Sequence, residues 1–221
     1  MGKEPRAGKI CIDGIQILQF RGYDSCGITT IDETGKFVTT KMASDSHYGG
    51  DCINRIKTEA KQRHDHRIGL GHTRWATHGS KTDVNAHPHH DDRGRIAIVH
   101  NGILSNFKEL KEEMITKLGI TPKSETDTEL VAQLTGYYMD QGYPTKEAFE
   151  KCLERLEGSF ALAMVSTETP DKLYFAKNAG PLHVGLCDDM IIASSDVSVF
   201  SNYTKKYITV EDNEVTVMSL N

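Results

Sequence analysis

The sequence predicts an α+β protein in which two antiparallel sheets pack face to face between outer helices, a four-layer αββα sandwich. Short strand-like segments dominate both ends of the chain, and helix-forming segments fill its middle. Trains of strands separated by turns indicate antiparallel sheets, whose outer faces need helices to cover them. Because residues 1–221 contain no internal repeat and no linker-like stretch, one domain is the simplest interpretation.

The elements of the N-terminal part follow from hydrophobic spacing and turn residues. Apolar groups recur at helical spacing in GKICIDGIQILQF, whereas CGITTID and KFVTTKM are rich in β-formers and flank a turn at Glu33–Gly35. A polar segment behind two glycines predicts a second helix, and RIGLGHT predicts a strand. The expected elements are a helix at 8–20, a hairpin at 26–42, a helix at 51–63 and a strand at 67–73.

The central part alternates loop, strand and helices. Residues 80–95 have the composition of a loop, and IAIVHNG predicts an apolar strand that ends at residues 100–102. One of the helices that follow opens with a capping-box pattern, since Ser124 and Thr126 lie three residues before Asp127 and Glu129. The expected helices are 106–119, 124–139 and 145–158, and the expected strands are 159–167, 172–178, 182–187, 190–195, 206–210 and 214–219.

Composition excludes several classes of function. With 38% hydrophobic residues, 26% charged residues and a net charge of −5, the chain has an ordinary globular composition and no basic surplus for nucleic acid or anionic membranes. The five cysteines are widely spaced and form no Cys-x-x-Cys pair, which favours a reducing, cytoplasmic setting. No apolar run is long enough to span a bilayer, and the first residues lack the apolar core of a secretory signal.

The stretch GLGHTRWATHG, residues 69–79, leads from an apolar segment into a polar turn. Arg74 offers a planar guanidinium that binds carboxylates through paired hydrogen bonds, and Thr77 and His78 add shorter donors. Together these side chains suit the carboxylate of a small zwitterion. The alternative is a surface ion pair for Arg74 and a core-filling role for Trp75, the only tryptophan of the chain.

Two further motifs combine polar groups with an element boundary. An asparagine amide beside a glycine N–H, as in HNG at 100–102, is the geometry of an oxyanion hole, which stabilises developing negative charge. Taken alone, Asn101–Gly102 is better explained as a simple turn. SETDTE at 124–129 is likewise explained by helix capping, although the carboxylate of Asp127 can also bind an ammonium group.

The histidine-rich segment NAHPHH raises the possibility of a metal site. His87, His89 and His90 lack the i, i+4 spacing of helical zinc sites, and no carboxylate partner is fixed beside them. We therefore expect solvated loop histidines, with no metal and no cofactor.

Five motifs follow one another along the chain: RGYDSCG, GHTRWATHG, NAHPH, HNGI and SETDTE. With them the chain resembles the glutaminase domains of the glutamine–fructose-6-phosphate aminotransferases over nearly its whole length. The later segments AGPLHVGL and IIASSD support the same resemblance. The purine-pathway phosphoribosyl amidotransferases share the scaffold, but their corresponding turn differs from HTRWATHG.

The resemblance implies an N-terminal-nucleophile hydrolase fold, which is an αββα sandwich, and a site that hydrolyses glutamine to release ammonia. It implies that Arg74 binds the α-carboxylate of glutamine and that Asp127 binds its α-ammonium group. It further implies that Asn101 and Gly102 form the oxyanion hole for the intermediate at the side-chain amide.

The rest of the turn also receives roles from the resemblance. Thr77 and His78 line the carboxylate pocket, and Trp75 helps to gate the route by which ammonia leaves. The implied partners are glutamine and the sugar-phosphate isomerase domains that follow in the family and use the ammonia to make glucosamine 6-phosphate.

One departure concerns the nucleophile, which in the family is an N-terminal cysteine that opens a strand reading Cys-Gly-Ile and uses its own α-amine as base. This chain opens with MGKEPRAGK, which resembles the segment after that strand, so we expect a domain truncated at its N-terminus. The polypeptide as printed is therefore expected to be inactive. Cys11 lies in a predicted helix, and Cys26, at a strand start, is the one candidate substitute.

Two other functions stay open. A pseudo-glutaminase would bind glutamine or regulate a partner without hydrolysis. An amidotransferase domain of another pathway would feed its ammonia to a different synthase.

Overall fold

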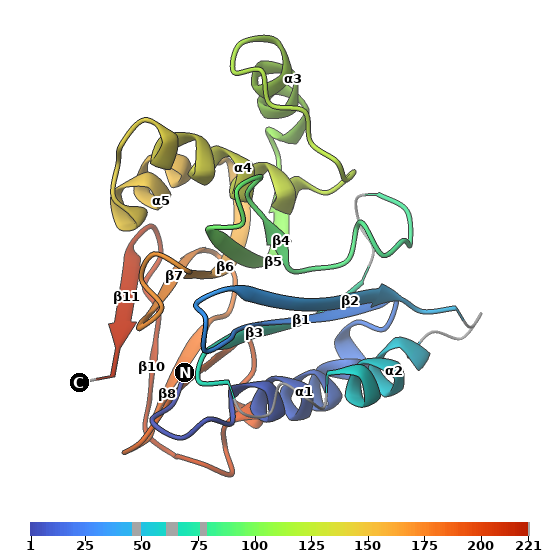
Figure 1. Ribbon diagram of the computed structural model, residues 1–221, viewed down its shortest axis with the longest axis vertical. Helices are drawn as coiled ribbons and strands as arrows, with labels where there is room; N and C mark the ends of the chain where they lie inside the picture. The colour runs from blue at the N-terminus through green and yellow to red at the C-terminus, as the bar shows by residue number, and fades with distance from the viewer. Residues whose placement is uncertain (46–49, 61–65, 76–78, 221) are drawn as a thin grey trace.

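Two antiparallel sheets face each other at the centre of the molecule, and helices cover the outer side of each (Figure 1). The computed structural model describes residues 1–45, 50–60, 66–75 and 79–220. From one side to the other, the layers are helices α1 and α2, a sheet of order β2-β1-β3, a sheet of order β11-β7-β6-β5-β4, and helices α4 and α5. This arrangement confirms the predicted α+β sandwich.

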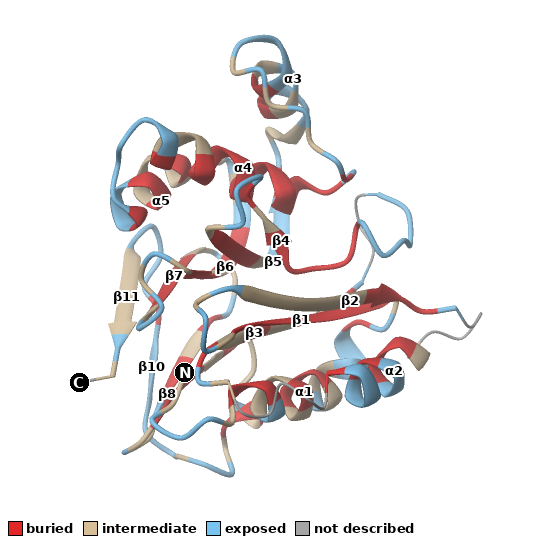
Figure 2. Cartoon of the chain, viewed as in Figure 1, coloured by how far each residue is buried: buried red, intermediate tan, exposed pale blue. Residues whose placement is uncertain are grey.

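The first sheet and its helices come from the N-terminal part of the chain. The central strand β1 (Ser25–Ile31) is buried along its whole length (Figure 2) and pairs antiparallel with both neighbours, which confirms the predicted hairpin. A Cβ at Gly27 would lie 1.9 Å from the backbone oxygen of His87, so only glycine fits where β1 passes the segment just before β4. The other elements are α1 (Ala7–Leu18), η1 (Gln19–Arg21), β2 (Phe37–Ala43), α2 (Asp51–Glu59) and β3 (Gly69–Arg74).

The second sheet contains the later strands, and α4 and α5 pack on its outer side. Its elements are β4 (His89–His90), β5 (Ile96–Leu104), α3 (Phe107–Thr116), α4 (Asp127–Asp140), α5 (Thr145–Leu153), β6 (Gly158–Ser166), β7 (Lys172–Asn178) and β11 (Val215–Ser219). A third, small sheet has the order β10-β8-β9. It consists of β8 (His183–Leu186), β9 (Ile191–Ser194) and β10 (Tyr207–Thr209), with the short η3 (Val197–Val199) after β9.

Three apolar clusters hold the layers together. One lies between the second sheet and α4 and α5, a second lies between the sheets, and a third joins the first sheet to α1 and α2. Buried and less buried residues alternate along β3, because successive side chains point to opposite faces of the sheet and so pack against different layers. None of the helices in the described part of the chain has the length and apolar character needed to cross a bilayer.

The structure corrects several expected boundaries. Strand β5 continues to Leu104, because Asn101 and Gly102 pair with Ala161 and Phe160 of β6, so the Asn-Gly dipeptide is not a turn. The predicted loop at 80–95 contains the two-residue strand β4. Helix α2 ends at Glu59, and the rest of its predicted range falls largely outside the described residues.

Candidate active site

A cavity of about 190 Å³ lies where the end of β3, the second half of β5 and the first turn of α4 meet. Residues from all three elements line it, and they include most of the predicted site residues. Two predicted site residues, Thr77 and His78, lie outside the described residues. The predicted residues that line the cavity are Arg74, Trp75, Asn101, Gly102 and Asp127.

Arg74 is the last residue of β3, and only 5% of its surface is exposed. Its guanidinium donates to the backbone oxygens of Gly79 and Ser80 at 3.4 Å each. Burial lowers the pKa of Arg74, while the nearby carboxylates of Asp24, Asp127 and Glu125 act in the opposite direction. A surface ion pair is therefore the wrong description, because the cation is buried beside the cavity.

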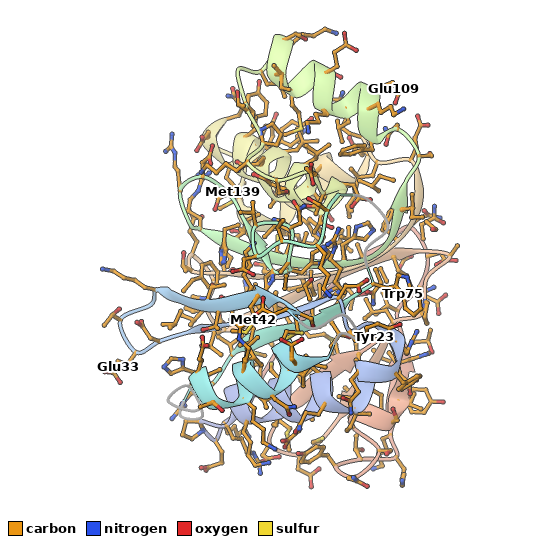
Figure 3. All side chains as sticks on the ribbon, turned by 90° about the vertical axis from the view of Figure 1, so that its right-hand side faces the viewer. Tyr23, Glu33, Met42, Trp75, Glu109 and Met139 are labelled. Atoms are coloured by element: carbon orange, nitrogen blue, oxygen red, sulfur yellow. The ribbon has the colours of Figure 1, made fainter. Side chains whose placement is uncertain are left out.

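Trp75 follows directly and is 57% exposed, so it does not fill the core as the alternative interpretation held. Its ring packs against Tyr23, with centroids 5.4 Å apart, and both residues lie on the same side of the molecule (Figure 3). The tryptophan thus forms part of the outer wall of the cavity.

Asp127 is the first residue of α4 and is buried. Its Oδ2 accepts a hydrogen bond from the backbone N–H of Leu104 at 3.1 Å, and its Oδ1 lies 3.5 Å from Nδ1 of His100. The helix N-terminus stabilises negative charge at this position. The helix cap uses the adjacent Thr126, whose Oγ1 accepts from the backbone N–H of Glu129 at 3.4 Å, so Asp127 is not consumed by capping.

The capping box is only half formed. The carboxylate of Glu129 accepts from the backbone N–H groups of Lys123 and Ser124 rather than from that of Thr126. Ser124 does not cap the helix either, because its Oγ accepts from the backbone N–H of Thr126 at 3.3 Å. The predicted pairing of Ser124 with Asp127 is therefore wrong, and that of Thr126 with Glu129 holds for the threonine.

Asn101 and Gly102 present a side-chain amide and a backbone segment to the cavity. Gly102 has a φ of 131°, and a Cβ there would lie 2.1 Å from the backbone oxygen of Ser159, so no other residue fits without a backbone shift. The Oδ1 of Asn101 lies 2.9 Å from Nε2 of His72. An amide and a peptide group at one rim of a polar cavity can stabilise an oxyanion.

Sequence reasoning missed His72. It lies two residues before Arg74 and therefore on the same face of β3, which is the signal that strand periodicity offered. Burial lowers its pKa to about 4, so the ring is neutral at physiological pH.

His72 belongs to a cluster of buried rings, and the expectation of solvated loop histidines is wrong. His87 and His89 are buried, and His90 is a half-buried residue of β4 whose Nε2 lies 2.9 Å from Oγ1 of Thr39. His87 stacks on His72 with ring centroids 4.2 Å apart, and Nε2 of His89 lies 2.9 Å from Oγ1 of Thr126. Burial lowers the pKa of both His87 and His89 well below the usual value. The segment at 87–89 is buried because its rings fill the space between β5 and the start of α4, where neutral rings pack well.

The thiols lie elsewhere. Cys26 is buried in the apolar cluster between β1 and the helices α1 and α2, and a hydrogen bond with Cys52, together with burial, raises its pKa. Burial raises the pKa of Cys11, in α1, to about 11. In the part of the chain that the structure describes, no cysteine lines the site cavity.

A second cavity, of about 260 Å³, meets the first at His72 and Asn101. It runs between β3 and β9, which are edge strands of their sheets in the described structure. Side chains of α1 close one face, and apolar residues of β6 and β7 close the other. We call this space the β3–β9 slot.

Met1 lies at the other end of the slot. Its α-amino group donates to the backbone oxygen of Ile191 at 2.9 Å, and the N–H of Ile191 donates back to the oxygen of Met1 at 2.8 Å. The next residue, Gly2, donates to the oxygen of Arg67 just before β3 at 2.9 Å. The first two residues thus already bridge the two strand edges.

Two solved structures have the same fold. Glutamine phosphoribosylpyrophosphate amidotransferase from B. subtilis aligns with a TM-score of 0.75 and 22% identity, covering 99% of this chain and 47% of that chain. A structure described as the allosteric regulatory enzyme of purine biosynthesis aligns with a TM-score of 0.80 and 24% identity, covering 98% of this chain and 45% of that one.

Sequence relatives are named glutamine–fructose-6-phosphate aminotransferase (isomerizing). The protein from Pyrobaculum aerophilum is 42% identical over 94% of this chain and 33% of its own length. Those from Thermococcus kodakarensis and Staphylococcus aureus are 41% and 36% identical over 97% and 96% of this chain and 34% of their own lengths. The chain thus spans about a third of the length of these curated relatives. Because the family model described as a glutamine amidotransferase domain matches residues 72–202, more than half of the chain, this protein belongs to the glutamine amidotransferase domain family.

Proposed function

We propose that residues 1–221 form a single glutaminase domain that hydrolyses the side-chain amide of glutamine and supplies ammonia for the conversion of fructose 6-phosphate to glucosamine 6-phosphate. The names of the relatives support this pathway. In this proposal the sugar-phosphate chemistry belongs to isomerase domains in the part of such proteins that this chain does not match. The free cysteines of the described structure suit the reducing cytoplasm as the compartment.

The observation that carries the proposal is a pair of buried, opposite charges at one small cavity. Arg74 and Asp127 line the same space and complement the α-carboxylate and α-ammonium groups of an amino acid. Bound in this way, glutamine directs its side-chain amide toward Asn101 and Gly102, which stabilise the oxyanion of the tetrahedral intermediate.

The remaining turn residues complete the proposed site. Thr77 and His78 line the pocket for the α-carboxylate. Trp75, exposed at the rim beside Tyr23, gates the route by which ammonia leaves. No cofactor or metal takes part in this scheme.

In this proposal the nucleophile is the thiol of a Cys-Gly-Ile segment joined to Met1. The α-amine of that cysteine takes the thiol proton, the thiolate attacks the amide carbon, and the resulting α-ammonium group returns the proton to the leaving nitrogen as ammonia departs. Water then hydrolyses the thioester to glutamate and regenerates the thiol. The β3–β9 slot supports the proposal, because a strand that continues from Met1 between the two edges reaches His72 and Asn101. The 221-residue polypeptide as printed has no such thiol and is expected to be inactive.

The test is release of ammonia from glutamine by three polypeptides: the 221 residues, the same chain with a processed Cys-led extension, and a matched Ser-led extension. Only the Cys-led form is expected to release ammonia. Steady release by the 221-residue chain that is abolished by Cys26→Ser would overturn this view and make Cys26 the nucleophile.

The lack of a thiol around the cavity, within the described residues, also favours a second candidate, a domain that binds glutamine without hydrolysing it. If the Cys-led form binds glutamine and releases no ammonia, this second function replaces the first.

A further inference from the structure

The side chain of His72 contacts the side-chain amide of Asn101, which belongs to the proposed oxyanion hole. Its Nε2 lies 2.9 Å from Oδ1 of Asn101 and 3.0 Å from the backbone oxygen of His100. Both atoms are hydrogen-bond acceptors, so Nε2 must carry a hydrogen and donate it. One side of the Asn101 amide is therefore occupied by a donor that comes from the opposite sheet.

The ring is held in this tautomer by its surroundings. Since burial keeps His72 neutral at physiological pH, it has only one N–H, and Nε2 uses it. Stacking on His87, with an interplanar angle of 26°, fixes the plane of the ring. Its Nδ1 is buried and has no hydrogen-bond partner within the described residues, so no neighbour there favours the other tautomer.

We infer that His72 is a positioning residue that sets which end of the Asn101 amide faces the cavity. With Oδ1 accepting from Nε2–H, the amide NH₂ points into the site as a donor. If the amide turned over, its NH₂ would meet the Nε2–H, and its carbonyl oxygen would face the developing oxyanion and repel it. The inference rests on the proposed function, because it assumes that Asn101 serves that oxyanion.

The backbone of Asn101 does not depend on His72. It is paired with Ala161 in the register of β5 with β6, which holds the Cα in place when the imidazole is removed. Loss of the ring should thus free the orientation of one amide rather than dismantle the strand. This separation makes the role testable.

The catalytic test uses the Cys-led form with its nucleophile restored. His72→Leu removes the donor, and kcat should fall about 10²–10³-fold with KM near that of the parent, as for loss of one oxyanion donor. His72→Gln restores an N–H donor and should recover most of kcat. In an Asn101→Ala background, His72→Leu should have no further effect on kcat, because both changes remove the same interaction.

A matched control is His89→Leu, which removes a buried ring that contacts Thr126 and not Asn101. It should lower the melting temperature while leaving kcat near that of the parent. If His89→Leu lowers kcat as strongly as His72→Leu, the effect is a general loss of packing and the positioning role is wrong.

A second measurement needs no activity and no variant. Nitrogen-15 NMR of the histidine rings in the 221-residue chain should show His72 as the Nε2–H tautomer at pH 7, whereas an Nδ1–H tautomer would overturn the inference. The catalytic outcomes also distinguish failure of the proposed oxyanion hole from failure of the role of His72. If Asn101→Ala leaves kcat unchanged, the proposed oxyanion hole fails and the inference with it. If Asn101→Ala lowers kcat and His72→Leu does not, only the role of His72 fails.

Discussion

Single residues decide what the cavity can bind. Arg74 and Asp127 are charges of opposite sign that are buried beside one space, each held by backbone groups of the surrounding loops and strands. Holding a buried cation costs free energy, which an anionic ligand group offsets when it binds. The arrangement therefore favours a small zwitterion over neutral or singly charged molecules.

Replacing Arg74 with alanine should weaken glutamine binding by about 2–5 kcal/mol, because the α-carboxylate would be buried without its partner. Isothermal calorimetry on the 221-residue polypeptide measures the change. The control is Arg93→Ala, which removes an exposed guanidinium paired with Asp140 on the surface. Equal affinities for the parent and Arg74→Ala would contradict the assigned role.

Gly102→Ala should destabilise the fold by at least about 2 kcal/mol, since a positive φ and a clash add together. The added Cβ would meet the oxygen of Ser159, whereas at Gly94, with a φ of 65°, nothing lies within 4 Å. Gly94→Ala is thus the control for the backbone conformation alone and should cost only about 1 kcal/mol. Urea unfolding compares the two variants. Similar losses in the free energy of unfolding would show that the clash at Gly102 is relieved by a small shift.

At the scale of elements, the residues between β4 and β5 connect the second sheet to α4 through hydrogen bonds. Asp91 is buried and accepts hydrogen bonds from the backbone N–H groups of Arg95 and Ile96, while its carboxylate pairs with the Arg95 guanidinium at 2.9 Å. Arg95 in turn donates to the backbone oxygen of Gly136 within α4 at 2.8 Å. This connection holds the helix, and with it Asp127, against the strand that carries Asn101.

Asp91→Ala should lower the free energy of unfolding by about 3–5 kcal/mol, because it breaks a buried ion pair and leaves backbone donors unsatisfied. The neighbouring Asp92 makes a comparable pair with Lys123, but that pair is exposed. Asp92→Ala should therefore cost no more than about 1 kcal/mol. Chemical denaturation of both variants tests the difference, and a loss as small as that of the control would mean that the Arg95 connection is not structural.

The buried histidines should make the fold sensitive to acid. Burial lowers the folded-state pKa of His72 to about 4 and those of His87 and His89 well below 6.5, so the unfolded chain binds more protons than the folded one. Their contribution to stability is complete above pH 6.5 and is lost as the pH falls from there toward 4, by up to about 1.4 kcal/mol per pH unit for each ring.

Urea unfolding at pH 7 and pH 5 measures this loss. In His89→Gln the difference between the two pH values should shrink, because this ring is buried in the folded chain. The control is His183→Gln, which changes a half-exposed side chain of β8. The same pH dependence in His89→Gln as in the parent would show that this ring does not titrate on unfolding.

For the whole molecule, the main feature is the way the two cavities meet. The β3–β9 slot separates the first sheet from the small sheet of β8, β9 and β10, and it ends at the site cavity beside Asn101. A strand in the slot would join the two sheets and deliver its first residue to the site. In the proposed enzyme, one segment would thus link the scaffold to the chemistry.

The 221-residue chain should make no glucosamine 6-phosphate from fructose 6-phosphate and ammonia. Its charged cavity suits an amino acid, and its sequence has no glycine-rich phosphate loop. Chromatographic detection of the aminosugar is the measurement, with a full-length relative as the positive control. Formation of the aminosugar by the chain alone would place a sugar-phosphate site within these residues.

The sequence by itself determined the order and type of nearly all elements. Hydrophobic spacing identified the helix of α1, the hairpin of β1 and β2, and the six C-terminal strands, because these patterns arise from local contacts with one buried face. It also singled out five of the residues that line the site cavity, through their positions at strand and helix boundaries and through the resemblance.

Only the tertiary structure decided how these residues act together. Residues 101 and 102 lie within a strand because β6 continues alongside them, and the histidines at 87 and 89 are buried because the space beside β5 needs filling. The contact of His72 with Asn101 joins two sheets across 29 positions of the chain. Such features depend on pairing and packing between distant segments, which local propensity does not encode.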